Sequence, residues 1–183
     1  MLPDAVGPVV QAARSLGLDY QGPLPGGRER PDGQRLEWQI GTPPTPDLPF
    51  LCGDLTPRAL RVPEGEVRVH ANGVRGVASL TVLVADLDAS LARYRALLGV
   101  EAAQGVTALD LPGIGVRQAQ FRLGRSSLAL VAPGPDPASP LRAQLAQRGE
   151  GVIGLALHGT QAGAPRSLPL AQTHGAAIDL ITY

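Results

Sequence analysis

Residues 79–99 read SLTVLVADLDASLARYRALLG, and the hydrophobic period changes part-way along this stretch. From Ser79 to Val84 aliphatic residues alternate with small or polar ones, which is typical of a half-buried strand. From Asp86 onward the aliphatic residues recur at helical spacing. Asp86 is a good N-cap, and Gly99 can adopt the left-handed conformation that ends a helix. The stretch therefore predicts a strand followed by a helix over residues 86–98.

The residues after this helix return to a period of two. Residues 117–123 alternate sharply, and Arg125-Ser126 forms a tight connection into residues 127–132, which predicts an antiparallel hairpin. A weaker strand is expected near residues 106–111. Residues 70–133 are thus predicted to form one complete βαβββ module.

The two ends of the chain each predict part of such a module. Residues 1–54 predict a helix over 4–16, followed by short strands near 18–21, 35–40 and 50–52, with no strand before the helix.

Residues 137–183 predict a helix over 139–148 and strands over 152–158 and 176–182. We expect the strand over 152–158 to supply the one missing before the first helix. Residues 1–183 would then form a single α+β domain, with 137–183 completing the sheet.

The composition excludes several classes of function. The 183 residues carry 16 basic and 16 acidic side chains, and every basic residue is Arg. The absence of Lys excludes Schiff-base chemistry and a Walker-type phosphate loop. A neutral balance without a basic run argues against binding to nucleic acid or to an anionic membrane. No apolar stretch is long enough for a bilayer span, and Cys52 is the single cysteine, so we expect a cytoplasmic protein.

Two motifs resemble those of a known family. Residues 28–38, RERPDGQRLEW, followed by PFL at 49–51, resemble a segment of glyoxalase-like domain proteins. Residues 70–73, HANG, resemble the H-P-N-G that opens their next module. These proteins belong to the vicinal oxygen chelate superfamily, which includes glyoxalases and bleomycin-resistance proteins. The resemblance implies paired βαβββ modules, here with the terminal modules trimmed, and it favours a homodimer.

The resemblance also implies where a metal would bind. Metalloenzymes of this superfamily place a His on the first strand of a module and a Glu on its last strand. The four corresponding positions outside the first module hold Ser79, Ala129, Gly154 and Asp179, and the last-strand position of the first module falls at about Gly53 or Cys52. Of these residues, Asp179 alone retains an acid. We therefore expect no metal and no other cofactor. The alternative is a rebuilt site formed by His158, His174 and Asp179.

The alternation of the strands also predicts a ligand-binding face. If the six aliphatic and aromatic strand residues face the covering helices, small and polar residues occupy the opposite face. The six are Leu80, Val82, Val84, Phe121, Leu128 and Leu130. The residues expected to contact a ligand are Arg122, Gln118, Gln120, Thr81, Asp179 and Trp38.

Three functions remain open from the sequence. The first is a metal-free small-molecule binding protein on the glyoxalase/bleomycin-resistance scaffold. The second is a divalent-metal-dependent lyase or dioxygenase that uses the rebuilt site. The third is a subunit whose ligand site is vestigial and whose sheet mainly assembles a dimer.

Overall fold

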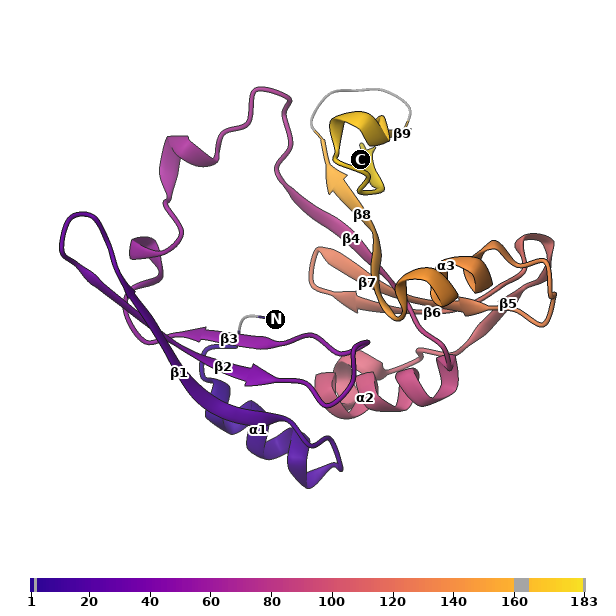
Figure 1. Cartoon of the computed structure of the whole chain (residues 1–183), viewed down its shortest axis with the longest axis horizontal. Coiled ribbons are helices and arrows are strands. Elements are labelled where there is room, and N and C mark those ends of the chain that lie inside the picture. Colours follow the sequence, from indigo (N-terminus) through magenta and orange to yellow (C-terminus); the bar gives the residue numbers. More distant parts are fainter. Residues whose placement is uncertain (2, 160–164, 183) are drawn as a thin grey trace. The chain divides into compact units, whose positions relative to one another are not determined.

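The computed structural model describes residues 1, 3–159 and 165–182. The chain divides into two compact units, Met1–Arg68 and Val69–Tyr183. Each unit combines helices with a sheet of its own, three-stranded in the first unit and seven-stranded in the second (Figure 1). The mixed helix and sheet content confirms the predicted α+β class.

The first unit is one helix followed by an antiparallel sheet of order β1-β2-β3. Its elements are α1 (Val6–Ser15), β1 (Gln21–Glu29), β2 (Arg35–Thr42) and β3 (Leu51–Asp54), with short 3-10 turns at Arg58–Leu60 and Gly65–Arg68. The strand predicted near residues 18–21 is misplaced, because β1 begins at Gln21 and runs on to Glu29.

Glycines let α1 approach the first sheet closely. A Cβ added at Gly41 would lie 3.0 Å from Val10 Cγ2, and one added at Gly53 would lie 3.0 Å from Val6 Cγ2. Val6 and Val10 are buried in this contact. Tyr20 is also fully buried, and its hydroxyl donates a hydrogen bond of 2.7 Å to the Pro49 carbonyl. The small residues of β2 and β3 therefore determine how tightly the helix packs.

A bidentate ion pair ties the end of β3 to the segment that follows it. Arg61 Nε and Nη2 donate to the two carboxylate oxygens of Asp54 at 2.6 and 2.8 Å, and both side chains are largely shielded from solvent. The hydrogen bonds from Arg61 hold the pKa of Asp54 below its usual value. The ionised carboxylate is thus favoured in the folded state.

We expect this pair to make the first unit sensitive to acid. Because the folded-state pKa is lowered, the stabilisation is present above the ordinary carboxyl pKa and is lost as the pH falls through the folded-state value. Asp54→Asn should lose about 1 kcal/mol of stability at neutral pH and less at about pH 3. Urea unfolding followed by the fluorescence of Trp38, which lies opposite Asp54 in the sheet, measures both values.

The exposed Glu66 provides the control, since it makes no ion pair among the described residues. Glu66→Gln should retain the acid sensitivity of the unaltered protein. An equal loss for Asp54→Asn at both pH values would contradict the prediction.

The second unit contains the predicted βαβββ module. Its elements are β4 (Gly76–Leu83), α2 (Leu87–Ala103), β5 (Leu109–Leu111), β6 (Val116–Leu123) and β7 (Ser126–Pro133), with a 3-10 turn at Pro112–Ile114. They are followed by α3 (Pro140–Arg148), β8 (Gly151–His158), β9 (Arg166–Ser167), a 3-10 turn at Leu170–Gln172 and β10 (Ile178–Ile181). The strand order is β5-β6-β7-β4-β8-β10-β9. The predicted hairpin is β6–β7, which pairs antiparallel along its full length.

The start of α2 and its break at Gly99 follow from the local sequence. The Asp86 carboxylate accepts hydrogen bonds of 3.0 Å from the backbone N–H groups of Asp88 and Ala89, as an N-cap does. Gly99 has φ of 84° and interrupts the helix where the sequence predicted its end. A further short helical segment follows as far as Ala103, which the sequence reading did not include.

The core of the second unit lies between α2 and strands β6 and β7. Phe121 is fully buried, and its ring centroid lies 5.9 Å from that of Tyr94 on α2. Of the six residues expected to face helices, Leu80 is the exception, because it remains 36% exposed. α2 packs over β6 and β7, and Leu80 lies further along the same face, on β4.

The pairing of β8 corrects one expectation. The strand over 152–158 was expected to complete the first module. Instead β8 pairs antiparallel with β4 on one side and parallel with β10 on the other. β8 is therefore hydrogen-bonded within the second unit, to β4 on one edge and, over Leu155–His158, to β10 on the other.

Candidate functional site

The residues predicted to bind a ligand gather on one face of the seven-stranded sheet. On β6, Gln118, Gln120 and Arg122 alternate with Ala119 and Phe121, whose side chains are buried on the α2 side. We call the side that carries Gln120 and Arg122 the polar face. α2 and α3 lie on opposite sides of β6 and β7 (Figure 1).

The strand register extends the polar face across five strands. One cross-strand row contains Arg122, Ser127, Ser79, Ala156 and Asp179, in the order β6, β7, β4, β8 and β10. The neighbouring row contains Gln120, Ala129, Thr81 and Gly154. Five of the six predicted ligand contacts, all except Trp38, therefore share the polar face.

The middle of the polar face consists of small side chains. A Cβ added at Gly154 would meet the Thr81 side chain only at ordinary contact distance, 3.6 Å. Ser79, Ser127 and Ala156 are equally short. Short side chains thus form the centre of these two rows, while the longer side chains of Arg122, Gln120 and Asp179 stand at their ends.

The longer polar groups of β6 are available to a ligand. The side chains of Gln118, Gln120 and Arg122 make no hydrogen bond or ion pair among the described residues. Arg117, on the other face of the same strand, differs: it pairs with Asp88 at 3.0 Å and with Asp110 at 2.9 Å. The Arg122 guanidinium therefore keeps all its donors free within the described parts of the chain.

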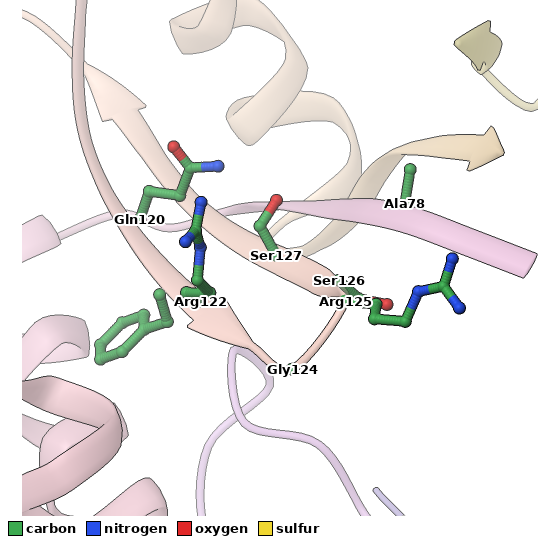
Figure 2. Close-up of a pocket in the computed structure, with 8 residues that line it drawn as sticks. Ala78, Gln120, Arg122, Gly124, Arg125, Ser126 and Ser127 are labelled. Atoms are coloured by element: carbon green, nitrogen blue, oxygen red, sulfur yellow. The ribbon is translucent and has the colours of Figure 1, made fainter. Parts of the chain in front are cut away.

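A cavity of about 730 Å³ opens at the end of the β6–β7 hairpin. Figure 2 shows the side chains of Gln120, Arg122 and Ser127 on the same side of the sheet, with Arg125 at the turn. The lining residues are Ala78, Gln120, Phe121, Arg122, Gly124, Arg125, Ser126 and Ser127. Sequence reasoning treated Arg125 only as part of the turn. The signal that could have identified Arg125 as a second guanidinium at this cavity is its position three residues after Arg122.

Trp38 lies in the first unit, on β2, and packs within its own sheet. It pairs with Gly26 on β1 and with Asp54 on β3. The indole lies so close over Gly26 that any Cβ there would collide with it. Trp38 is therefore part of the packing of the first sheet. That Trp38 also contacts a ligand stays a prediction.

The structure does not bring the three residues of the alternative metal site together. His158 ends β8, and its Nε2 lies 3.3 Å from the Arg125 carbonyl oxygen. Asp179 accepts a 2.6 Å hydrogen bond from the Ser167 hydroxyl. His174 lies in the turn before β10, with φ of 52°. In residues 1, 3–159 and 165–182, no three His, Cys, Asp or Glu side chains are placed to hold a metal ion.

Comparison with known proteins identifies the family. The model of the glyoxalase-like domain family matches residues 2–98, slightly more than half of the chain. The chain belongs to the glyoxalase-like domain family. This places the glyoxalase-like protein within the vicinal oxygen chelate superfamily, as its motifs indicated, and its βαβββ module agrees with that assignment.

One solved structure supports the fold, and a second, more distant match is also found. A hypothetical protein from Staphylococcus aureus matches all of this chain with a TM-score of 0.64 at 10% identity, and the chain spans 64% of that protein. The methylmalonyl-CoA epimerase from Mycobacterium tuberculosis matches 62% of this chain and 91% of its own, with a TM-score of 0.48 at 20% identity. The sequence matches none of the curated proteins with which it was compared.

The residues of this glyoxalase-like protein do not fit the metal that the superfamily implies. The register confirms that Ser79, Ala129, Gly154 and Asp179 all lie on the polar face, in two neighbouring rows. Only Asp179 has a carboxylate, and it already accepts a hydrogen bond from Ser167. One carboxylate does not make a catalytic divalent-metal site, which needs about three protein ligands.

The helices were also compared with the length and hydropathy of a membrane span. None of those in the described part of the chain meets both requirements.

Proposed function

We propose that this glyoxalase-like protein binds a small molecule carrying an anionic group on its polar face, without a metal ion. The observation that carries the proposal is the guanidinium of Arg122, which makes no ion pair or hydrogen bond among the described residues. It lines the cavity together with the free amide of Gln120, and the row of Arg122 continues across the sheet through small residues, while Gln118 lies further along β6. A planar guanidinium donates two parallel hydrogen bonds to a carboxylate or phosphate, and this fixes the orientation of the ligand as well as attracting it.

The two glutamines give the site its selectivity. An amide offers both a donor and an acceptor, so Gln118 and Gln120 can recognise the polar groups that accompany the anion. The short side chains of Thr81 and Ala129 leave room for the body of the ligand next to these groups. The absence of the ligand set at the four superfamily positions supports binding without a metal ion over lyase or dioxygenase chemistry.

We expect Arg122→Gln to weaken anion binding about tenfold or more, because it removes a charge-assisted bidentate contact while leaving an uncharged polar side chain at this position. The protein is first treated with a chelator and checked by elemental analysis. A panel of small carboxylates and phosphates is then tested by the shift in melting temperature, and the best is measured by calorimetry on both proteins.

Arg148→Gln is the matched control, since Arg148 is an exposed arginine at the end of α3 that has no partner among the described residues. It should bind as the unaltered protein does. Equal weakening by both substitutions would mean that only net charge matters. A stoichiometric metal that is lost in His158→Ala would overturn the metal-free proposal and revive the alternative enzyme.

A further inference from the structure

The polar face carries opposite charges at its two ends. Arg122 on β6 and Asp179 on β10 occupy the same cross-strand row. The three residues between them are Ser127, Ser79 and Ala156, none of which is charged or long. The row therefore consists of a cation, a stretch of small residues and an anion.

The two charges are too far apart to neutralise each other. Strands lie about 4.8 Å apart, so the four steps from β6 to β10 correspond to roughly 19 Å along the sheet. Neither Arg122 nor Asp179 makes an ion pair among the described residues. Each charge is exposed and is available to a group brought by a ligand.

Asp179 is held in a defined orientation. Ser167 Oγ donates to its Oδ1 at 2.6 Å, which leaves Oδ2 without a hydrogen-bond partner in the described residues. The neighbouring Arg166 pairs with Leu180 in the register, so its side chain leaves the sheet on the opposite face. No arginine of β9 therefore competes for the carboxylate.

From this row we infer that the ligand is an elongated zwitterion, with its anionic group at Arg122 and an ammonium group at Asp179. The inference rests on the proposed function and specifies the class of ligand. A ligand that carried only an anion would leave the Asp179 carboxylate without a partner and would gain nothing at that end of the row. An ammonium group there forms a charge-assisted hydrogen bond with Oδ2.

Alanine peptides of two to five residues are suitable probes. They carry one ammonium and one carboxylate, their side chains match the small floor, and an extended pentapeptide spans about 17 Å. Affinity, measured by NMR titration of the isotope-labelled full chain, should rise with length toward the pentapeptide. N-acetylation of the pentapeptide should weaken binding about tenfold, because it removes the ammonium charge.

The decisive variant is Asp179→Asn, which keeps an acceptor for Ser167 but removes the charge. It should bind the free and the acetylated pentapeptide equally, at the affinity that the unaltered protein has for the acetylated one. Glu101→Gln removes an exposed carboxylate on α2 and should leave the difference between the two peptides intact.

The outcomes separate this inference from the function on which it rests. If acetylation has no effect, or if Asp179→Asn preserves the difference, the zwitterion inference is wrong, while Arg122-dependent binding of simple anions would still support the proposed function. If neither peptides nor anions bind in an Arg122-dependent way, both are wrong.

Discussion

Phe121→Ala is expected to lower the free energy of unfolding of the second unit by about 3–5 kcal/mol. Phe121 has no exposed surface and packs against Tyr94, with the ring centroids 5.9 Å apart and the ring planes tilted by 37°. Truncation removes this ring and leaves a cavity between α2 and β6 that the surrounding backbone cannot fill, so both the buried area and the ring contact are lost. Aromatic residues make up only 3% of the chain, so the ring of Phe121 is one of few in the protein.

Urea unfolding followed by far-ultraviolet circular dichroism measures the loss for Phe121→Ala. The fluorescence of Trp38 reports the first unit separately, since the protein has a single tryptophan. Ile114→Ala is the control, because Ile114 is 62% exposed and should change stability by less than about 0.5 kcal/mol. A loss for Phe121→Ala no larger than that of the control would mean that the contact between α2 and β6 does not stabilise the unit.

Gly134→Ala should cost about 1–3 kcal/mol, although it adds only one methyl group. A Cβ at this position would lie 2.9 Å from the carbonyl carbon of Gly115 and 3.0 Å from its oxygen. The obstacle is backbone, so no side-chain rotation relieves it. Gly134 also donates to the Gly115 carbonyl at 2.8 Å and accepts from Arg142 Nη2 at 2.6 Å, so the strain reaches the contact with α3.

The nearby Gly113→Ala provides the comparison. A Cβ at Gly113 would meet nothing within 4 Å, and its φ is outside the left-handed region. We expect this variant to unfold at the same urea concentration as the unaltered protein, or slightly higher, because alanine restricts the unfolded chain. Similar destabilisation by both substitutions would show that loss of glycine flexibility, not the close approach at Gly134, is responsible.

The elements that sequence reasoning located well are those determined by neighbours in the chain. Asp86 caps α2 through N–H groups two and three residues away, and the β6–β7 hairpin follows from alternation on both sides of a tight turn. The same alternation placed Gln118, Gln120 and Arg122 together on one face. Such local rules do not depend on the rest of the fold.

The elements that sequence reasoning missed depend on distant parts of the chain. β1 contains Pro23 and Pro25, which argue against a strand, yet it lies at the edge of its sheet, where one side needs no hydrogen bonds. The partners of β8 are set by the order of the whole sheet. The partial exposure of Leu80 depends on how far α2 extends over the face of the sheet. Homodimerisation and a cytoplasmic location stay predictions.

The position of β4 has a consequence for how the protein is made. β4 is the first strand of the second unit to leave the ribosome, but it lies in the interior of the finished sheet. Ser79 pairs with Ser127 on one side and with Ala156 on the other, so both edges of β4 stay open until much later segments have been synthesised. Such long-range pairing slows folding and exposes strand edges on the nascent chain. We therefore expect the second unit to acquire its structure only near the end of translation and to benefit from chaperones that shield β4 until β8 arrives.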